Sequence, residues 1–111
     1  MEYLLFIATD TEPDAGVFQP ADMEPWLAEG ARRGMRKQGH RLAPVADATT
    51  IRVRGGELLV TDGPFTESKE WIGGFDIIDC ESLDDAIDYA SRHPMARFGR
   101  IEIRPFWPTP F

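Results

Sequence analysis

The sequence predicts an α+β fold in which two helices cover one face of a largely antiparallel sheet. Three observations support this prediction: a continuous apolar run near the start, two segments with apolar residues at helical spacing, and short alternating runs separated by glycines. The chain has 111 residues, the length of one domain, so residues 1–111 are expected to form a single unit.

The first half of the chain is predicted to contain a strand and a helix. Residues Tyr3 to Ala8 are continuously apolar, which favours a central strand covered on both faces. The run is too short for a membrane span and lacks the basic flank of a signal peptide. The helix is expected to start near Asp22 as its N-cap, to tolerate Pro25 in its first turn, and to end at Gly39.

Two alternating runs, Ile51–Arg54 and Glu57–Thr61, flank the dipeptide Gly55-Gly56, which is a strong signal for a two-residue hairpin turn. This turn places Arg54 opposite Glu57 and Ile51 opposite Val60. One face of the hairpin, predicted to point toward the core, then carries Ile51, Val53, Leu58 and Val60. The other face carries Arg52, Arg54, Glu57 and Leu59.

The second half adds a strand, a helix and a final strand. Residues Trp71 to Cys80 read as a strand, with a bulge or a close backbone approach at Gly73-Gly74. Ser82 is expected to cap a helix that Pro94 ends, and Arg100 to Arg104 alternate as the last strand. The resulting order, β-α-β-β-β-α-β, predicts a ferredoxin-like plait with an extra hairpin.

The predicted sheet has one face without helices, and this face suggests self-association. It would carry Arg52, Arg54, Leu59, Glu102 and Arg104 beside an aromatic tail, a mixture poorly suited to full exposure. A second copy could cover it, which predicts a homodimer whose two sheets face each other around a cavity.

Composition limits the classes of partner and site. The formal net charge of −7 has the wrong sign for binding to nucleic acid phosphates. Cys80 is the only cysteine, so no internal disulfide is possible, which fits a reducing cytoplasm. The two histidines, His40 and His93, lack the paired spacing of metal ligands, and no phosphate-binding glycine loop is present. We therefore expect no metal and no cofactor.

The run Val60-Thr-Asp-Gly-Pro-Phe-Thr-Glu-Ser-Lys-Glu70, followed by Ile72-Gly-Gly-Phe75, resembles the YCII-related family, in the branch named for its Asp-Gly-Pro-Phe motif. Segments 48–52, 82–87 and 101–105 also look like that branch. The resemblance implies a dimeric α+β barrel, and some members are fused to or encoded with sigma factors. The wider family has a suggested histidine–aspartate pair with the histidine on the first helix. This sequence departs from that pattern, because no histidine lies between Asp22 and Gln38.

Two residues are candidates for proton transfer. Asp62 lies at a strand end before a forced turn, where it could act as an acid or base, or its carboxylate could cap nearby backbone N–H groups. His93 lies in the predicted last turn of the second helix. Its structural interpretation is a cation or donor beside the C-terminal carbonyls.

The candidate ligand-binding residues are cationic or aromatic. Arg52, Arg54 and Arg104, on strands predicted to be adjacent, could bind a carboxylate or an enolate-like anion, or they could pair with Glu57 and Glu102. Phe65 and Trp71 are candidates for contact with an aromatic ligand.

Two classes of function follow, besides a dimer with no ligand of its own. The first is a small-molecule binding protein or enzyme, of proton-transfer, lyase or isomerase type, with its pocket at the dimer cavity. The second is a non-enzymatic regulatory or protein-interaction module. Its surface would be the acidic second helix or the aromatic tail, and the resemblance links it to a sigma factor.

Overall fold

The computed structural model describes residues 1–64 and 71–109, and it has the α+β architecture with antiparallel sheets that the sequence predicts. Along the chain the elements are β1 (Glu2–Thr9), the 3₁₀ helix η1 (Pro20–Met23), α1 (Glu24–Arg32), β2 (Arg36–Arg41), the 3₁₀ helix η2 (Val45–Asp47), β3 (Thr49–Arg54), β4 (Glu57–Asp62), β5 (Ile72–Asp79), α2 (Leu83–Ser91), α3 (Met95–Phe98) and β6 (Gly99–Pro105).

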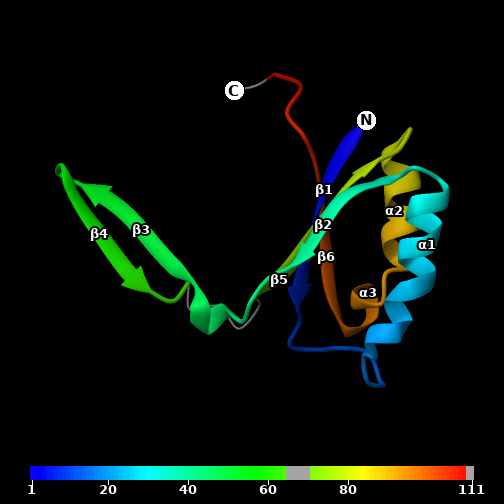
Figure 1. The fold of residues 1–111 in the computed structure, drawn as a ribbon, viewed down its shortest axis with the longest axis horizontal. Helices are drawn as coiled ribbons and strands as arrows, with labels where there is room; N and C mark the ends of the chain where they lie inside the picture. Colours follow the sequence, from blue (N-terminus) through cyan, green and yellow to red (C-terminus); the bar gives the residue numbers. More distant parts are fainter. Residues whose placement is uncertain (65–70, 110–111) are drawn as a thin grey trace.

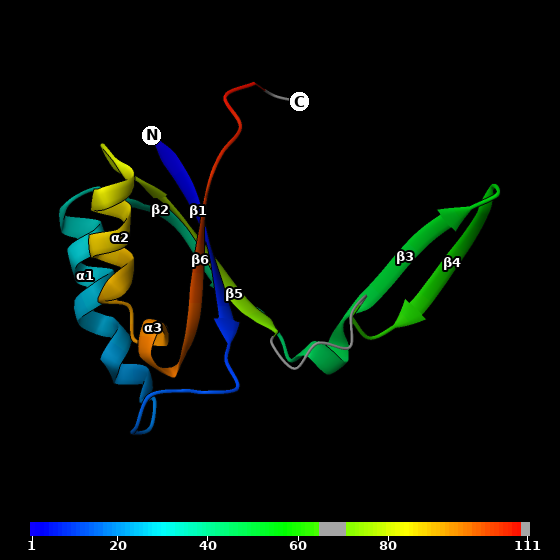
Figure 2. The ribbon, with the colours of Figure 1, turned by 180° about the vertical axis from the view of Figure 1, so that it is seen from behind.

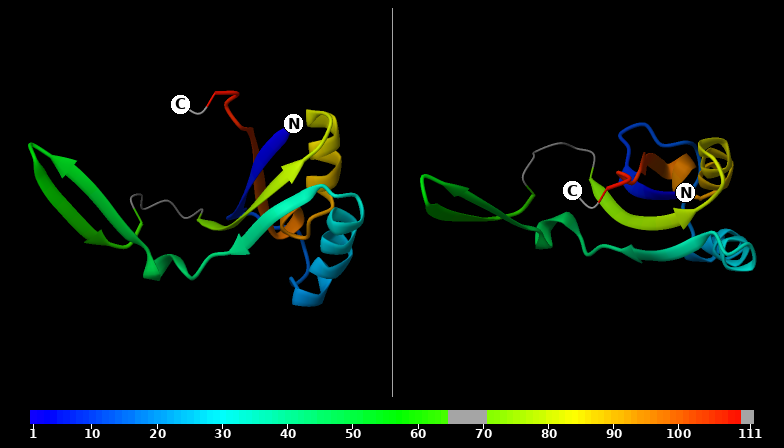
Figure 3. Two further views of the ribbon diagram at one scale, coloured as in Figure 1. Left: turned by 45° about the horizontal axis from the view of Figure 1, so that its top comes forward. Right: turned by 90° about the horizontal axis from the view of Figure 1, so that it is seen from above.

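Four strands form the central sheet in the order β2-β5-β1-β6, and every neighbouring pair is antiparallel. The apolar first strand, β1, lies inside the sheet as predicted, but it is buried on one face only, because Leu4 and Phe6 on its other face are half-buried. Helices α1 and α2 lie side by side against one face of this sheet (Figure 1, Figure 3). This arrangement is consistent with a ferredoxin-like α+β fold.

The core lies between the central sheet and the two helices. Alternate side chains of β1, those of Tyr3, Leu5 and Ile7, are buried there. Across the helical layer, Trp26 of α1 stacks on Tyr89 of α2 with ring centroids 4.2 Å apart. Trp26 Nε1 donates to the Tyr89 carbonyl, and the Tyr89 hydroxyl donates to the Trp26 carbonyl, both at 2.8 Å. These reciprocal bonds fix the two helices to each other at the centre of the core.

The first helix ends earlier than the sequence predicted. Gly34, not Gly39, is the C′ residue, with a positive φ of 65°. Its N–H donates to Ala31 and that of Met35 donates to Gly30, which is the hydrogen-bond pattern of a Schellman motif. The chain then continues as β2, so residues 36–41 are a strand and the predicted element order lacked it. The apolar spacing predicted too long a helix, because Met35 continues the apolar stripe and is buried although it lies after the end of α1.

Three local predictions in the second half are confirmed. The Ser82 side chain caps α2 by accepting a hydrogen bond from the Asp85 N–H at 3.2 Å. The pairing of β1 with β5 skips Gly73, which is the predicted bulge. At Gly74 a Cβ atom would lie 2.9 Å from the His40 carbonyl oxygen, so the backbones of β2 and β5 approach closely there.

Strands β3 and β4, with the turn between them, form a separate two-stranded ribbon that we call the arm. Its register is the predicted one, and both turn glycines, Gly55 and Gly56, have positive φ, as a type I′ turn requires. The arm projects away from the central sheet (Figure 1, Figure 2). The prediction that one of its faces packs into the core is therefore wrong. That face stays 58–65% exposed, through Ile51, Val53, Leu58 and Val60.

The central sheet has a second face on which none of the described helices lies, and we call it the open face (Figure 3). Apolar side chains of β1 and β5 are half-buried on it, namely Leu4, Phe6, Phe75 and Ile77. On the neighbouring strand β6, Glu102 and Arg104 are exposed. The predicted position of these two residues opposite the helices is confirmed, whereas Arg52, Arg54 and Leu59 lie on the arm instead.

Candidate functional site

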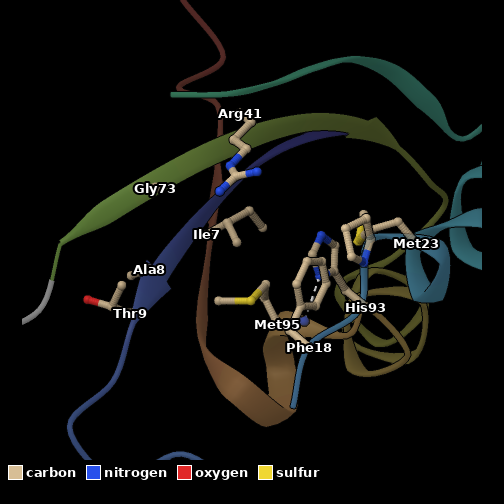
Figure 4. A pocket seen from close by; sticks show the side chains of 10 residues that line it. Ile7, Ala8, Thr9, Phe18, Met23, Arg41, Gly73, His93 and Met95 are labelled. Carbon is tan, nitrogen blue, oxygen red and sulfur yellow. Dashed lines mark hydrogen bonds between the residues drawn. The ribbon is translucent and has the colours of Figure 1, made fainter. Parts of the chain in front are cut away.

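A pocket of about 490 Å³ lies between the central sheet and the helical layer, and we call it the inner pocket. Five parts of the chain meet there: the end of β1, the segment that leads into α1, the end of β2, the start of β5, and the turn after α2 (Figure 4). Its lining residues are Ile7, Ala8, Thr9, Phe18, Pro20, Met23, Arg41, Gly73, His93 and Met95. Most of these side chains are apolar, as in many small-molecule sites.

His93 brings a buried imidazole to the inner pocket. It follows α2 by two residues and is 4% exposed. Its Nδ1 accepts a hydrogen bond from the Met95 N–H at 2.9 Å, and its ring packs edge-on against Trp26 with centroids 4.6 Å apart. Burial, and then the positive charge of Arg36, lower the pKa of His93 to about 4. The imidazole is therefore neutral at pH 7, and its proton lies on Nε2 because Nδ1 is an acceptor.

The free nitrogen of His93 faces accessible space. Among the residues that the structure describes, Nε2 makes no hydrogen bond, and no buried side-chain nitrogen or oxygen lacks a partner. Nε2 is thus accessible rather than sealed in the core. The inner pocket is the space that His93 lines, so its Nε2–H is a donor available to a ligand. Of the two roles expected of His93 beside the helix carbonyls, cation or donor, burial disfavours the cation.

Arg41 is the one charged residue among the described residues that line the inner pocket. It ends β2, and its guanidinium group is turned toward Ile7, on the opposite side of the pocket from Met95 (Figure 4). Within residues 1–64 and 71–109 its side chain makes no ion pair and no hydrogen bond. An unpaired guanidinium beside apolar walls favours a carboxylate or another planar anion as its partner.

A second pocket of about 610 Å³, the outer pocket, adjoins the inner one. Both are lined by Thr9, Arg41 and Gly73. The outer pocket also takes in Trp71 and residues 42–45. Thr9 holds the backbone of Trp71 in both directions, because its N–H donates to the Trp71 carbonyl at 2.8 Å and its Oγ1 accepts from the Trp71 N–H at 2.7 Å.

A part-buried ion pair lies near His93 of the inner pocket. Arg36 Nε lies 2.7 Å from Asp76 Oδ1, and Asp76 is 5% exposed. Burial raises the pKa of Asp76, and the Arg36 guanidinium opposes that rise. The pair fits because Gly39 has no side chain: a Cβ atom there would collide with both partners. The charge of Arg36 also favours the neutral form of His93. Arg36 thus affects the protonation of a pocket residue although it does not itself line the pocket.

The structure separates most of the predicted site residues. His93 lines the inner pocket and Trp71 lines the outer one. Asp62 is exposed at the end of the arm strand β4 and lines neither pocket. Phe65 lies outside the described residues.

The three arginines do not form one cluster. Arg52 and Arg54 lie on β3, which pairs with β4, whereas Arg104 lies on β6, which pairs with β1. The prediction that these strands are adjacent is wrong. All three side chains are exposed, and Arg104 lies 3.9 Å from Glu102 of its own strand.

Sequence reasoning missed Arg41 and the methionines of the inner pocket, Met23 and Met95. Arg41 follows the segment that the apolar spacing assigns to a helix, so nothing marks it as the end of a strand beside a pocket. Residues 36–41 contain no apolar side chain, so the strand that places Arg41 lacks the alternation by which a strand is predicted.

The described residues offer little to a metal ion. Within residues 1–64 and 71–109 no three histidine, cysteine, aspartate or glutamate side chains lie close enough together to hold one. At His93 the Nδ1 lone pair is already used by the Met95 N–H, so only Nε2 could become a ligand, and only after losing its proton. Within the same ranges, no helix has both the length and the apolar character needed to cross a membrane.

Comparison with known proteins gives a family but no activity. A protein-family model described as the YCII-related domain matches residues 13–110. An uncharacterized protein of Rhizobium meliloti (strain 1021) is 48% identical over 67 residues, which cover 59% of this chain and 54% of that protein. The match therefore spans about half the length of that relative. The family match extends over most of the chain and agrees with the resemblance carried by the motif around Asp62, so the chain belongs to the YCII-related family.

Proposed function

We propose that the protein binds a small organic anion, a carboxylate with an apolar body, in the inner pocket. The observation that carries the proposal is Arg41, whose guanidinium has no ion pair or hydrogen bond among the described residues and is turned into a pocket whose other walls are mostly apolar. A charge-assisted hydrogen bond of this kind contributes about 1.5–3 kcal/mol, and Arg41 is exposed, so its guanidinium is accessible to an incoming ligand.

His93 supplies the second polar contact of the proposed site. Its neutral ring offers one donor, Nε2–H, which suits a carboxylate or carbonyl oxygen that Arg41 holds from the other side. Two such donors would also stabilise an enolate, the intermediate formed when a proton leaves the carbon beside a carbonyl. The enzymatic form of the proposal is therefore a proton-transfer reaction of lyase or isomerase type.

Asp62 is our candidate for the base in that reaction. It lies on the arm and outside both pockets of its own chain. A role in proton transfer therefore requires the arm of a second copy to reach the pocket. Replacement of Asp62 by asparagine would then abolish turnover and leave ligand binding to Arg41 intact.

We propose in addition that the protein is a homodimer. The arm leaves one apolar face exposed, and a two-stranded ribbon is marginally stable in water by itself. The open face of the central sheet likewise leaves Phe6 and Phe75 half-buried. A second copy related by a twofold axis could cover both surfaces at once.

Ligand binding can be tested by isothermal titration with 4-methylpentanoate, a carboxylate with a branched apolar body. Arg41→Gln is expected to weaken binding roughly tenfold or more, because it removes the charge and keeps most of the side-chain length. Lys37→Gln is the matched control, since it removes an exposed charge from the same strand outside the pocket and should leave affinity unchanged. Equal affinity of wild type and Arg41→Gln, or no binding by wild type at millimolar concentration, would contradict the proposal.

The second candidate function is a partner-binding regulatory module. It is favoured by the tail, where Trp107 is 78% exposed and Phe106 is 44% exposed. Removal of residues 106–111 should then abolish capture of a sigma factor, the class of partner that the family resemblance suggests. Capture that persists without the tail would exclude this surface.

A further inference from the structure

We infer that the ligand occupies the inner and outer pockets together, and that it is a carboxylate with an apolar group on each side of its charged group. This inference rests on the proposed function, because it uses the same contact with Arg41. It adds the shape and chemical class of the molecule. A single-tailed carboxylate would fill one pocket only.

The first support is the geometry of the two pockets. Both are lined by Thr9, Arg41 and Gly73, so they adjoin each other at these residues, and we call them the inner and outer lobes of the proposed site. At this junction Gly73 presents only backbone, and the bulge that it forms in β5 belongs to the same junction. A molecule bound at the junction can therefore extend in two directions.

The second support is the position of charge. Of the lining residues that the structure describes, Arg41 alone is charged, and it lines both pockets. A ligand anion must lie at the junction if it is to contact the guanidinium. The apolar walls on each side then favour apolar groups over water, because burial of apolar surface is favourable.

The third support is the different character of the two lobes. The outer lobe has the indole of Trp71, whose backbone is held at both N–H and carbonyl by Thr9. An indole face favours an aromatic group. The inner lobe has the flexible side chains of Met23 and Met95, which adapt to a branched aliphatic group.

The test compares a carboxylate that carries two apolar groups with two carboxylates that each carry only one of them. The compound 2-benzyl-4-methylpentanoate joins 3-phenylpropanoate and 4-methylpentanoate through a shared carboxylate-bearing carbon. Isothermal titration of the full chain should show that the joined compound binds at least about tenfold more tightly than either half, because one carboxylate then anchors two buried groups.

Trp71→Ala tests whether the aromatic group of the ligand lies in the outer lobe. We expect it to weaken the joined compound and 3-phenylpropanoate by about tenfold and to leave 4-methylpentanoate within about twofold. Trp107→Ala, which removes an indole that is 78% exposed, is the matched control and should change none of the three affinities. If Trp71→Ala does not fold, Trp71→Leu keeps apolar bulk at the position and removes the aromatic face.

The outcomes separate this inference from the proposed function. Binding of 4-methylpentanoate that depends on Arg41, with no gain from the joined compound, would overturn the two-lobe ligand and leave the proposed function standing. Equal losses for all three ligands in the Trp71 variants would also overturn it. Failure of every carboxylate to bind would contradict both.

Discussion

His93 shows how one buried side chain can carry both a stability effect and a binding role. The ring is covered by Trp26 and held by the Met95 N–H, so the folded protein accepts its neutral form only. Its pKa is about 4 in the folded chain, whereas the pKa of an exposed histidine is 6.5. Between these two values the unfolded chain binds a proton that the folded chain refuses.

This difference predicts a loss of stability in acid. Because the folded-state pKa is depressed, the contribution of His93 is fully present above about pH 6.5 and is lost as the pH falls toward about 4. The shift corresponds to roughly 3 kcal/mol in the free energy of unfolding. Urea unfolding at several pH values between 7 and 4 should show the decline.

His93→Gln is the comparison that isolates this effect. Its amide oxygen can still accept from the Met95 N–H, and it does not titrate. The raised pKa of Asp76 acts in the opposite direction, but it is present in both proteins and cancels in their difference. A decline of the same size in His93→Gln would show that the acid sensitivity arises elsewhere.

At the scale of elements, two glycines near each other in sequence are required for different reasons. Gly34 ends α1 in the left-handed region, with no neighbouring atom within 4 Å of a Cβ at that position. Gly39 lies in β2 directly over the ion pair of Arg36 with Asp76. The first position is limited by backbone conformation, and the second by space.

Substitution by alanine should therefore lower the free energy of unfolding by different amounts at the two positions. Gly34→Ala is expected to lower the free energy of unfolding by about 1 kcal/mol, the cost of a positive φ in a residue with a Cβ. Gly39→Ala is expected to lower the free energy of unfolding by roughly 3 kcal/mol. Its Cβ would push the Arg36 and Asp76 side chains apart and leave the buried Asp76 carboxylate without its partner. Urea unfolding measures both, and equal losses would show that the ion pair adapts to the added methyl group.

At the scale of the whole molecule, the arm and the open face are two apolar surfaces that the described residues leave exposed or only half-buried. In the views of Figure 1 and Figure 2 the arm extends away from the central sheet. Its exposed face carries Leu58, at 61% exposure. Contiguous apolar surface of this kind marks an interaction site more often than a solvated surface.

The proposed homodimer predicts that charge on one face of the arm will disrupt assembly. Leu58→Lys places an ammonium group on the apolar face and should shift the protein from dimer to monomer in sedimentation velocity. Thr61→Lys adds the same charge to the same strand on its other face and should leave the dimer unchanged. A wild-type protein that sediments as a monomer at micromolar concentration would rule out the dimer, and a Leu58→Lys variant that still sediments as a dimer would exclude the apolar face of the arm from the interface.

Local interactions explain what could be predicted without the structure. The Gly55-Gly56 turn set the register from Ile51–Val60 to Arg54–Glu57, because a two-residue turn allows only one pairing of its flanking strands. The cap at Ser82 and the bulge at Gly73 were readable for the same reason, since each depends on residues close in the chain or on a residue without a side chain. The apolar run of β1 also indicated a central strand.

The sequence by itself therefore determined the α+β class, the hairpin register and the family. Only the tertiary structure decided that the arm leaves the central sheet, because alternating strands read the same in a sheet and in a free ribbon. It also decided the inner pocket, where Ile7, Met23, Arg41 and His93 meet from distant parts of the chain. The tertiary structure also decided that His93 is neutral, because burial lowers its pKa and burial exists only in the packed molecule.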